Sequence, residues 1–451
     1  MKNKFIQKIS LGAALLLLTS NTTFAQAPEQ SYTPTPENMK ARQEFQDNKF
    51  GIFLHWGIYS MTAQGEWYMT THNIHRDEYA KLASGFYPSR FNAAEWVSAI
   101  KASGAKYICI TSRHHDSFSM FDTKESDFDI VDATPFKRDV LKELADECHK
   151  QGIKLHFYYS HLDWRRDDYP EGGGTGRGTG RPKGHGDWKS YYKFMNNQLT
   201  ELLTNYGPVG AIWFDGVWDQ PKDFDWQLEE QYALIHKLQP ACLVGNNHHR
   251  TPYAGEDFQM FERDLPGENK AGLSGQSVSS LPLETCETMN GMWGYKIEDQ
   301  NYKSPKALIH YLVKAAGKNA NLLMNIGPQP NGELPATAVD RLKKVGEWMD
   351  QYGETIYGTR GANGIIIVTT KKGDVAPHPW GVSTRKGDRL FIHVLDLKDN
   401  TLYIPLKAKV KKAMQFTDKA SLSFKQDKDG ILLKLPKVPD DIDYVIELII
   451  K

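Results

Sequence analysis

The chain has 451 residues, and its 55 Lys and Arg balance 55 Asp and Glu, so the formal net charge is zero. This balance gives no sign of the basic surface that nucleic-acid binding or attraction to an anionic membrane requires. The length allows one large domain and a smaller one. Aromatic residues make up 12% of the chain, a content that large cores share with sugar-binding sites; composition alone favours the core interpretation.

The first 25 residues have the pattern of a secretory signal peptide. Three lysines precede an apolar run over residues 11–18, and the small Ala25 follows at a suitable cleavage position. The run is too short to span a bilayer, and no cysteine stands at the cleavage point to carry a lipid anchor. We therefore expect a signal peptide over 1–25 and a mature protein that is periplasmic or extracellular, without membrane insertion.

The few cysteines do not indicate a disulfide framework. The chain has four, at Cys109, Cys148, Cys242 and Cys286, and no two have CxxC spacing. Cys109 and Cys242 lie in apolar, strand-like runs, where a small buried thiol is ordinary. Neither disulfides nor a cysteine-based zinc site is expected.

From residue 50 onward, short apolar runs alternate with longer helical patterns. The strand-like runs cover residues 50–57, 106–115, 153–161, 211–216, 242–249 and 321–328. The helical patterns cover residues 92–105, 134–152, 187–207, 229–240, 304–317 and 335–353. Such alternation predicts a parallel sheet buried on both faces.

Three of these helices carry start signals. Asn92 is followed three residues later by a glutamate, which is the spacing of a capping box. Thr134 and Ser304 are each followed directly by proline, which favours an N-cap at the first residue and the first helical position at the second. We expect helices to begin at these three residues.

Polar side chains stand where the predicted strands end. They are His55, His114, His115, Tyr159, His161, Asp215, Asn246, Asn247 and His248. In a (β/α)8 barrel these ends converge on one face, where catalytic groups are carried. An open doubly wound sheet is the alternative, but it would normally show a glycine fingerprint for a phosphate, and "LHWGIYS" is not one.

The pattern changes after about residue 360. Short apolar runs separated by turn residues predict a small antiparallel β-sandwich. We therefore expect a (β/α)8-like catalytic domain over 30–358 and a sandwich over 359–451. Residues 361–374 form an apolar run between glycines, which fits a linker hairpin or an edge strand. The glycine-rich stretch 170–186 is expected to be a mobile loop on the active face of the barrel.

Three carboxylates lie beside aromatic residues. Asp215 in "AIWFDGVWDQ" is favoured over Asp219, because a charge at the mouth of an apolar strand is costly unless it is used. The alternative for Asp215 is a helix cap or a salt bridge. Glu66 lies beside a tryptophan, which is weaker evidence for a catalytic role. Glu262 follows Phe258 and Phe261, which would raise its pKa towards that of a general acid.

The histidines at the strand ends leave a metal-dependent hydrolase open as an alternative. Against a zinc site, no HxH or HxxxH pair occurs among them, and the adjacent His114 and His115 would point to opposite faces of a strand. Hydrogen bonds from these residues to sugar hydroxyls fit equally well.

Seven motifs, in order, resemble the α-L-fucosidases of glycoside hydrolase family 29. They are "FGIFLHWGIYS", "GEWY", "YICITSRHHDSFSMFDT", "FYYSHLDW", "IWFDG", "ETCETMNGMWGY" and "LLMNIGPQPNGELP". The resemblance covers roughly residues 30 to 358. It implies a (β/α)8-like catalytic domain, a C-terminal β-sandwich, no metal or other cofactor, and retaining exo-hydrolysis of α-linked L-fucose from fucosylated glycans.

The resemblance also implies catalytic roles. Asp215 matches the family's nucleophile, and Glu262, which closes a D-F-x-x-x-E pattern in a variable loop, matches the acid/base. Glu268, Glu284 and Glu287 are the alternatives for the acid/base. A retaining mechanism requires the two catalytic carboxyls to lie about 5–5.5 Å apart.

The remaining matches concern sugar binding. Those to the fucose-binding residues are His55, Glu66, Trp67, His114, His115 and Tyr159. Trp213 and Trp293 match aromatic walls, and with Phe53 are the candidates for an apolar site around the sugar's methyl group. Arg250 or His248 takes the place of a family arginine. A carbohydrate-binding protein without catalysis is the non-enzymatic alternative.

Overall fold

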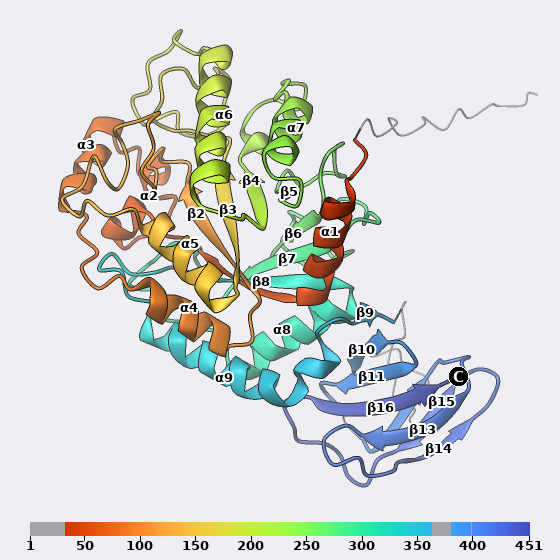
Figure 1. Cartoon of the computed structure of the whole chain (residues 1–451). Coiled ribbons are helices and arrows are strands. Elements are labelled where there is room, and N and C mark those ends of the chain that lie inside the picture. The colour runs from red at the N-terminus through yellow and green to blue at the C-terminus, as the bar shows by residue number, and fades with distance from the viewer. Residues whose placement is uncertain (1–31, 363–379, 398) are drawn as a thin grey trace, which may run out of the picture.

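A computed structural model describes residues 32–362, 380–397 and 399–451 (Figure 1). The expected signal peptide, 1–25, and most of the segment 361–374 lie outside these residues. In the part of the chain that is described, no helix is long and apolar enough to cross a membrane.

Eight parallel strands form one nearly closed barrel. They are β1 (Phe50–Leu54), β2 (Tyr107–Arg113), β3 (Lys154–Ser160), β4 (Ala211–Asp215), β5 (Leu243–Asn246), β6 (Gln259–Glu262), β7 (Leu283–Thr288) and β8 (Ala320–Ile326). Their order is β5-β4-β3-β2-β1-β8-β7-β6, and β5 and β6 at its ends are in contact. The predicted (β/α)8-like architecture is confirmed.

Helices surround this barrel on its outside (Figure 1). They are α1 (Pro36–Asn48), α2 (Tyr68–Thr71), α3 (Arg76–Ala80), α4 (Ala93–Ala102), α5 (Val140–Gln151), α6 (Trp188–Asn205), α7 (Leu228–Leu238), α8 (Pro305–Gly317) and α9 (Ala336–Tyr352). The predicted caps at Asn92 and Ser304 are confirmed, since each side chain accepts a backbone N–H of the first turn.

The predicted start of α5 at Thr134 is wrong. This helix begins at Val140, after Asp139, whose carboxylate accepts the N–H of Lys142. Thr134 instead stabilises a turn, because its hydroxyl donates to the backbone oxygen of Ile130 and accepts the N–H of Phe136. Aspartate is as good an N-cap as threonine, and here it prevails.

Two barrel strands, β6 and β7, were not predicted from the sequence. Glu262 was expected in a variable loop, and this is wrong, because it is the last residue of β6. Both strands contain polar residues in "QMFE" and "LETCET" and lack a continuous apolar run. Pairing with neighbouring strands makes them part of the barrel: β6 pairs with β7, and β7 pairs with β8.

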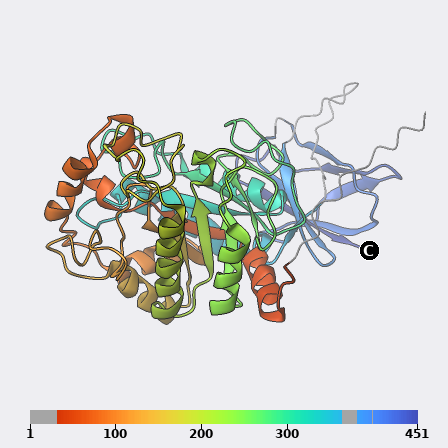
Figure 2. The same ribbon diagram turned by 90° about the horizontal axis from the view of Figure 1, so that it is seen from above.

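The C-terminal part is an antiparallel sandwich, as predicted. Its strands are β9 (Arg360–Gly361), β10 (Gly381–Lys386), β11 (Arg389–Val394), β12 (Thr401–Ile404), β13 (Val410–Gln415), β14 (Ser423–Gln426), β15 (Ile431–Lys434) and β16 (Tyr444–Ile450). One sheet has the order β13-β16-β11-β10-β9 and the other β12-β15-β14. The sandwich lies at one side of the barrel, against α8 (Figure 2).

All four cysteines are buried and unpaired. Cys109 and Cys286 lie inside the barrel, on β2 and β7, in one apolar cluster with Phe53 and Trp213. Cys109 acts as a small core residue beneath the site described next, and Cys286 reaches its wall.

Candidate active site

A cavity of about 360 Å³ opens at the carboxyl ends of the barrel strands. It is lined by Phe53, His55, Glu66, Trp67, His114, His115, Tyr158, Trp213, Asp215, Trp218, Asn247, His249, Glu262, Leu273, Cys286 and Trp293. Ten of the twelve residues predicted for catalysis or binding, Phe53 included, are in this set. The two that are absent are Tyr159 and Arg250.

Asp215 ends β4, and its carboxylate is held by two donors in the cavity wall. The hydroxyl of Tyr158 donates to Oδ2 at 3.0 Å, and the indole N–H of Trp218 donates to Oδ1 at 2.9 Å. Burial, together with the charge of Glu262, raises the pKa of Asp215 from 3.8 to about 7. The tryptophan after the strand therefore orients and partly stabilises a charge that is otherwise costly.

The turn after β4 separates the two aspartates of "FDGVWD". Gly216 has φ +93°, and the short helix η3 (Val217–Asp219) follows it. Asp219 turns away from the cavity and accepts hydrogen bonds from the hydroxyls of Tyr169 and Thr175. Of the two, Asp215, which the sequence favoured, is the one that lines the cavity.

Glu262 lies beside Asp215 and shares a donor with it. The side-chain amide of Asn247 lies 2.9 Å from Glu262 Oε2 and 3.4 Å from Asp215 Oδ1. His249 Nε2 is 3.8 Å from the same Glu262 oxygen. One amide therefore spans two carboxylates at the mouth of the cavity, which is the arrangement that paired acid and nucleophile chemistry needs.

Three buried histidines form one wall. His55 Nδ1 lies 2.6 Å from Asn325 Oδ1, and His114 stacks on Tyr158 with ring centroids 5.2 Å apart. Burial lowers the pKa of His55 and of His115 to about 3, so both are neutral at working pH. The expectation that His114 and His115 point to opposite faces is wrong, because β2 ends at Arg113 and both side chains turn into the cavity.

Glu66 and Trp67 also line the cavity, and the ring of Trp67 lies beside His115. Glu66 is 2% exposed and accepts the N–H of Gly294 at 2.7 Å; burial raises its pKa. Trp67 stacks on Trp218, with centroids 5.9 Å apart and planes 17° apart. The cavity thus joins a carboxyl acceptor to an aromatic face, a combination that suits a sugar ring.

Phe53, Trp213 and Trp293 form the apolar wall. Phe53 lies 5.1 Å from Trp213 and 6.2 Å from Trp293, measured between ring centroids. Beneath them, Glu284 accepts the indole N–H of Trp213 at 2.9 Å and the hydroxyl of Tyr107 at 2.6 Å. This part of the cavity is the one suited to a methyl group.

None of the three alternative acid/base glutamates lines the cavity. Glu284 lies inside the barrel under Trp213, Glu287 pairs with Arg263 and Lys303, and Glu268 pairs with Lys270. Glu262 is the candidate that the geometry retains.

Tyr159 does not face the cavity, and this prediction is corrected. Successive residues of a strand point to opposite sides, so that Tyr158 faces Asp215 while Tyr159 points outward and its hydroxyl donates to Gln198. The motif "FYYS" holds both tyrosines, and only the register decides between them.

Arg250 is likewise absent from the cavity. Its guanidinium contacts the hydroxyl of Tyr253 and the backbone oxygen of Lys222. Its neighbour His248 pairs with Glu256 at 2.9 Å. Arg263, next to Glu262 in sequence, instead stacks over the wall residue Trp293 at 4.9 Å.

Sequence reasoning missed Tyr158, Trp218, Asn247 and His249 as site residues. Trp218 and Asn247 carried a signal: Trp218 follows the Asp215 turn, and Asn247 stands among the polar side chains at the end of the fifth predicted strand. His249 carried none beyond its neighbourhood. Among the described residues, no group of three or more His, Cys, Asp or Glu side chains could hold a metal ion.

Comparisons with known proteins agree with this geometry. The family model described as Alpha-L-fucosidase matches residues 18–354. An alpha-L-fucosidase of Dictyostelium discoideum is 26% identical over 91% of this chain and 93% of its own length. The plasma alpha-L-fucosidase of Rattus norvegicus is 28% identical, over 87% and 85% respectively.

Solved structures are similar over nearly the whole chain. Alpha-L-fucosidase isoenzyme 1 from Paenibacillus thiaminolyticus is 33% identical, with a TM-score of 0.77, over 92% of this chain and all of its own. A GH29 alpha-L-fucosidase from Bacteroides thetaiotaomicron, trapped as a covalent intermediate with 2-fluoro-fucosyl fluoride in a glutamate-to-glutamine mutant, has a TM-score of 0.79 at 26% identity. That likeness covers 94% of this chain and 99% of the other.

Proposed function

The chain belongs to the alpha-L-fucosidase family and is a glycoside hydrolase; we propose that it removes terminal α-linked L-fucose from fucosylated glycans by a two-step retaining mechanism. The observation that carries this proposal is the pair of Asp215 and Glu262 joined by the amide of Asn247. A single cavity there offers a nucleophile, a proton donor and an aromatic wall.

In the first step, the ionised Asp215 attacks the anomeric carbon and forms an ester with it. The bond from that carbon to the leaving-group oxygen breaks, and protonated Glu262 gives its proton to this oxygen. Positive charge builds on the sugar ring in between, and the carboxylate of Asp215 stabilises it. Tyr158 and Trp218 hold the carboxylate in place by donating to its two oxygens.

In the second step, Glu262 acts as a base. It takes a proton from water while the water oxygen attacks the anomeric carbon and the ester to Asp215 breaks. Two inversions restore the α configuration. The amide of Asn247 supports Glu262 while it is ionised, since it lies 2.9 Å from Oε2.

The side chains that line the cavity support a fucoside as the substrate. Buried neutral histidines and Glu66 supply hydrogen-bonding groups for hydroxyls, and Phe53, Trp213 and Trp293 surround space for the methyl group that distinguishes fucose from a hexose. The secretory pattern of residues 1–25 supports an enzyme that acts in the periplasm or outside the cell.

The test is azide rescue of Asp215→Ala on an aryl α-L-fucoside. We expect turnover to fall by about three orders of magnitude or more, as for loss of a nucleophile. Azide should restore it and form the inverted β-fucosyl azide, because azide enters from the face that Asp215 left.

Asp219→Asn is the matched control, since its carboxylate also follows β4 but binds Tyr169 and Thr175. Any loss in this variant should not respond to azide. Near-normal turnover of Asp215→Ala without azide would exclude Asp215 as the nucleophile.

A further inference from the structure

Ser160, the last residue of β3, lies directly behind His115. Its side chain is fully buried, and its Oγ lies 2.7 Å from His115 Nδ1 and 2.6 Å from the backbone oxygen of Leu162. A carbonyl oxygen can only accept, so the one hydroxyl proton of Ser160 must point to Leu162. Ser160 Oγ is therefore an acceptor towards the histidine, and Nδ1 of His115 carries the proton.

This fixes what the other ring nitrogen can do. A neutral imidazole has one proton, so Nε2 of His115 holds a lone pair. Nε2 lies 3.7 Å from Asp215 Oδ2. Two acceptors face each other across that gap, and the interaction is favourable only when a donor enters between them.

We propose that Ser160 is a positioning residue that locks the tautomer of His115, so that Nε2 accepts a hydrogen bond from the sugar hydroxyl next to the reacting carbon. This rests on the proposed function, because the donor is a substrate hydroxyl. A hydroxyl held beside the attacking carboxylate gains strength as a donor when charge builds on the ring. His115 then accepts a hydrogen bond from the substrate and donates none to the carboxylate of Asp215.

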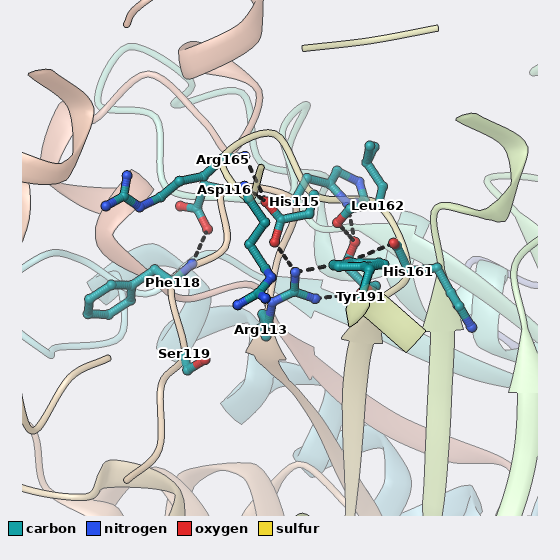
Figure 3. Close-up of polar contacts among 12 residues, drawn as sticks. Arg113, His115, Asp116, Phe118, Ser119, His161, Leu162, Arg165 and Tyr191 are labelled. Atoms are coloured by element: carbon teal, nitrogen blue, oxygen red, sulfur yellow. Dashed lines mark hydrogen bonds and ion pairs between the residues drawn. The ribbon is translucent and has the colours of Figure 1, made fainter. Parts of the chain in front are cut away.

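The surroundings keep Ser160 and His115 in this relation. On β2, the Arg113 guanidinium donates to the backbone oxygen of Ser160 at 2.8 Å and to the hydroxyl of Tyr191 at 3.0 Å. That hydroxyl in turn donates to the backbone oxygen of His161 (Figure 3). Arg113 also forms a fully buried ion pair with Asp163. The loop after β3 is thus tied to the neighbouring strand at several points.

The ring of His115 is enclosed on its other sides. The rings of Trp164 and Trp67 pack against it edge to face, at 5.2 and 5.8 Å between centroids. The backbone N–H of Trp164 also donates to the backbone oxygen of His115 at 2.7 Å. Rotation of the imidazole away from Ser160 would require this cage to open.

The tautomer can be measured directly by ¹⁵N NMR of the histidine rings in the substrate-free enzyme. His115 is assigned by the signal that His115→Asn removes. We expect a protonated Nδ1 and an unprotonated Nε2 in the wild type, and a mixture of both tautomers in Ser160→Ala. A protonated Nε2 in the wild-type enzyme would overturn the proposal, whether or not the alanine variant folds.

The consequence for catalysis is tested with an aryl α-L-fucoside and its 2-, 3- and 4-deoxy analogues. Ser160→Ala should lower kcat/KM for the parent fucoside by about tenfold, the effect of one lost hydrogen bond in a buried site. The penalty should disappear on the 2-deoxy analogue, which lacks the hydroxyl next to the reacting carbon, and should persist on the 3- and 4-deoxy analogues. An equal penalty on all four substrates would mean a merely structural role and would refute the proposal.

Ser103→Ala is the matched control. Ser103 is also fully buried, and its hydroxyl donates to the backbone oxygen of Ile100 at 2.6 Å, but it caps the end of α4 away from the cavity. It should leave kcat/KM unchanged on every analogue. If the wild type hydrolyses no fucoside at all, the proposed function fails, whereas the NMR result still decides the tautomer.

Discussion

At the scale of single residues, the environment of Asp215 sets the pH range in which the enzyme works. The nucleophile must be ionised, and burial raises its pKa from 3.8 to about 7. We therefore expect kcat/KM for an aryl fucoside to fall as the pH drops through about 7, well above the ordinary range of an aspartate. The hydrogen bond from Trp218 acts in the opposite direction and lowers this pKa.

Trp218→Phe tests that hydrogen bond, since it removes the N–H and keeps an aromatic ring. Without the donor, the pKa of Asp215 rises further, so the acid limb of the kcat/KM profile should move to higher pH. Trp188→Phe is the control, because its indole N–H donates to Gln227 and not to the catalytic pair. An acid limb that stays in place in Trp218→Phe would show that this contact does not tune the nucleophile.

Residue predictions succeeded where a strand end alone decides the position. His55 and Asp215 follow apolar runs, and any closed parallel barrel brings such ends together. They failed where one step of register decides, as between Tyr158 and Tyr159. They also failed where a loop's path decides, as for Arg250, whose side chain leaves the cavity. A local sequence pattern predicts neither the register of a strand nor the path of a loop.

At the scale of elements, the turn between β4 and η3 aims the nucleophile. Gly216 adopts φ +93°, and a Cβ there would lie 2.6 Å from Leu162 Cβ and 2.7 Å from its backbone N. Gly216→Ala should therefore displace the turn, lower the free energy of unfolding by about 2 kcal/mol or more, and reduce kcat.

Gly184→Ala separates steric crowding from backbone strain. Gly184 has a similar φ of +77°, but a Cβ placed there would meet no atom within 4 Å. The substitution should cost about 1 kcal/mol from strain alone and leave kcat unchanged. Thermal melts and aryl-fucoside kinetics of both variants provide the comparison. Equal effects would contradict a specific role for the close approach to Leu162.

The sequence predicted best those elements that a local pattern marks, such as a helix cap or an apolar run. The helices after Asn92 and Ser304 begin where their caps stand, and six strands coincide with apolar runs. β6 and β7 could not be recognised from the sequence, because neither contains a continuous apolar run long enough to mark a strand. Glu262 ends β6 at the site, and Glu284 lies in β7 beneath Trp213.

At the scale of the whole molecule, the barrel and the sandwich share a core. Phe391 of β11, Val445 of β16 and Phe416, directly after β13, belong to the same apolar cluster as the side chains between the barrel strands and the surrounding helices. The ring of Phe416 lies 6.1 Å from that of Tyr352 of α9. The other face of that sheet packs within the sandwich itself. The sequence predicted both parts but not this contact, because an alternating strand does not reveal which partner covers each face.

Phe391→Ala should therefore destabilise the barrel as well as the sandwich. We expect a loss of about 3–5 kcal/mol, as for a buried phenylalanine, and a lower midpoint in tryptophan-detected denaturation. Every tryptophan except Trp380 precedes residue 359, so this signal reports mainly on the barrel.

Leu402→Ala is the control, since Leu402 is buried in the separate core of the sandwich. It should shift the tryptophan-detected midpoint less than Phe391→Ala does. A midpoint that Phe391→Ala leaves unchanged would show that the two parts unfold independently.

The covalent bond between Asp215 and the sugar can be observed by trapping the intermediate. The enzyme is incubated with 2-fluoro-fucosyl fluoride, digested, and mapped by tandem mass spectrometry. We expect one 2-fluoro-fucosyl group per chain, esterified to Asp215, and none in Asp215→Ala. A label on Glu262, Glu66 or any other residue, or an unlabelled but inactivated enzyme, would contradict this expectation.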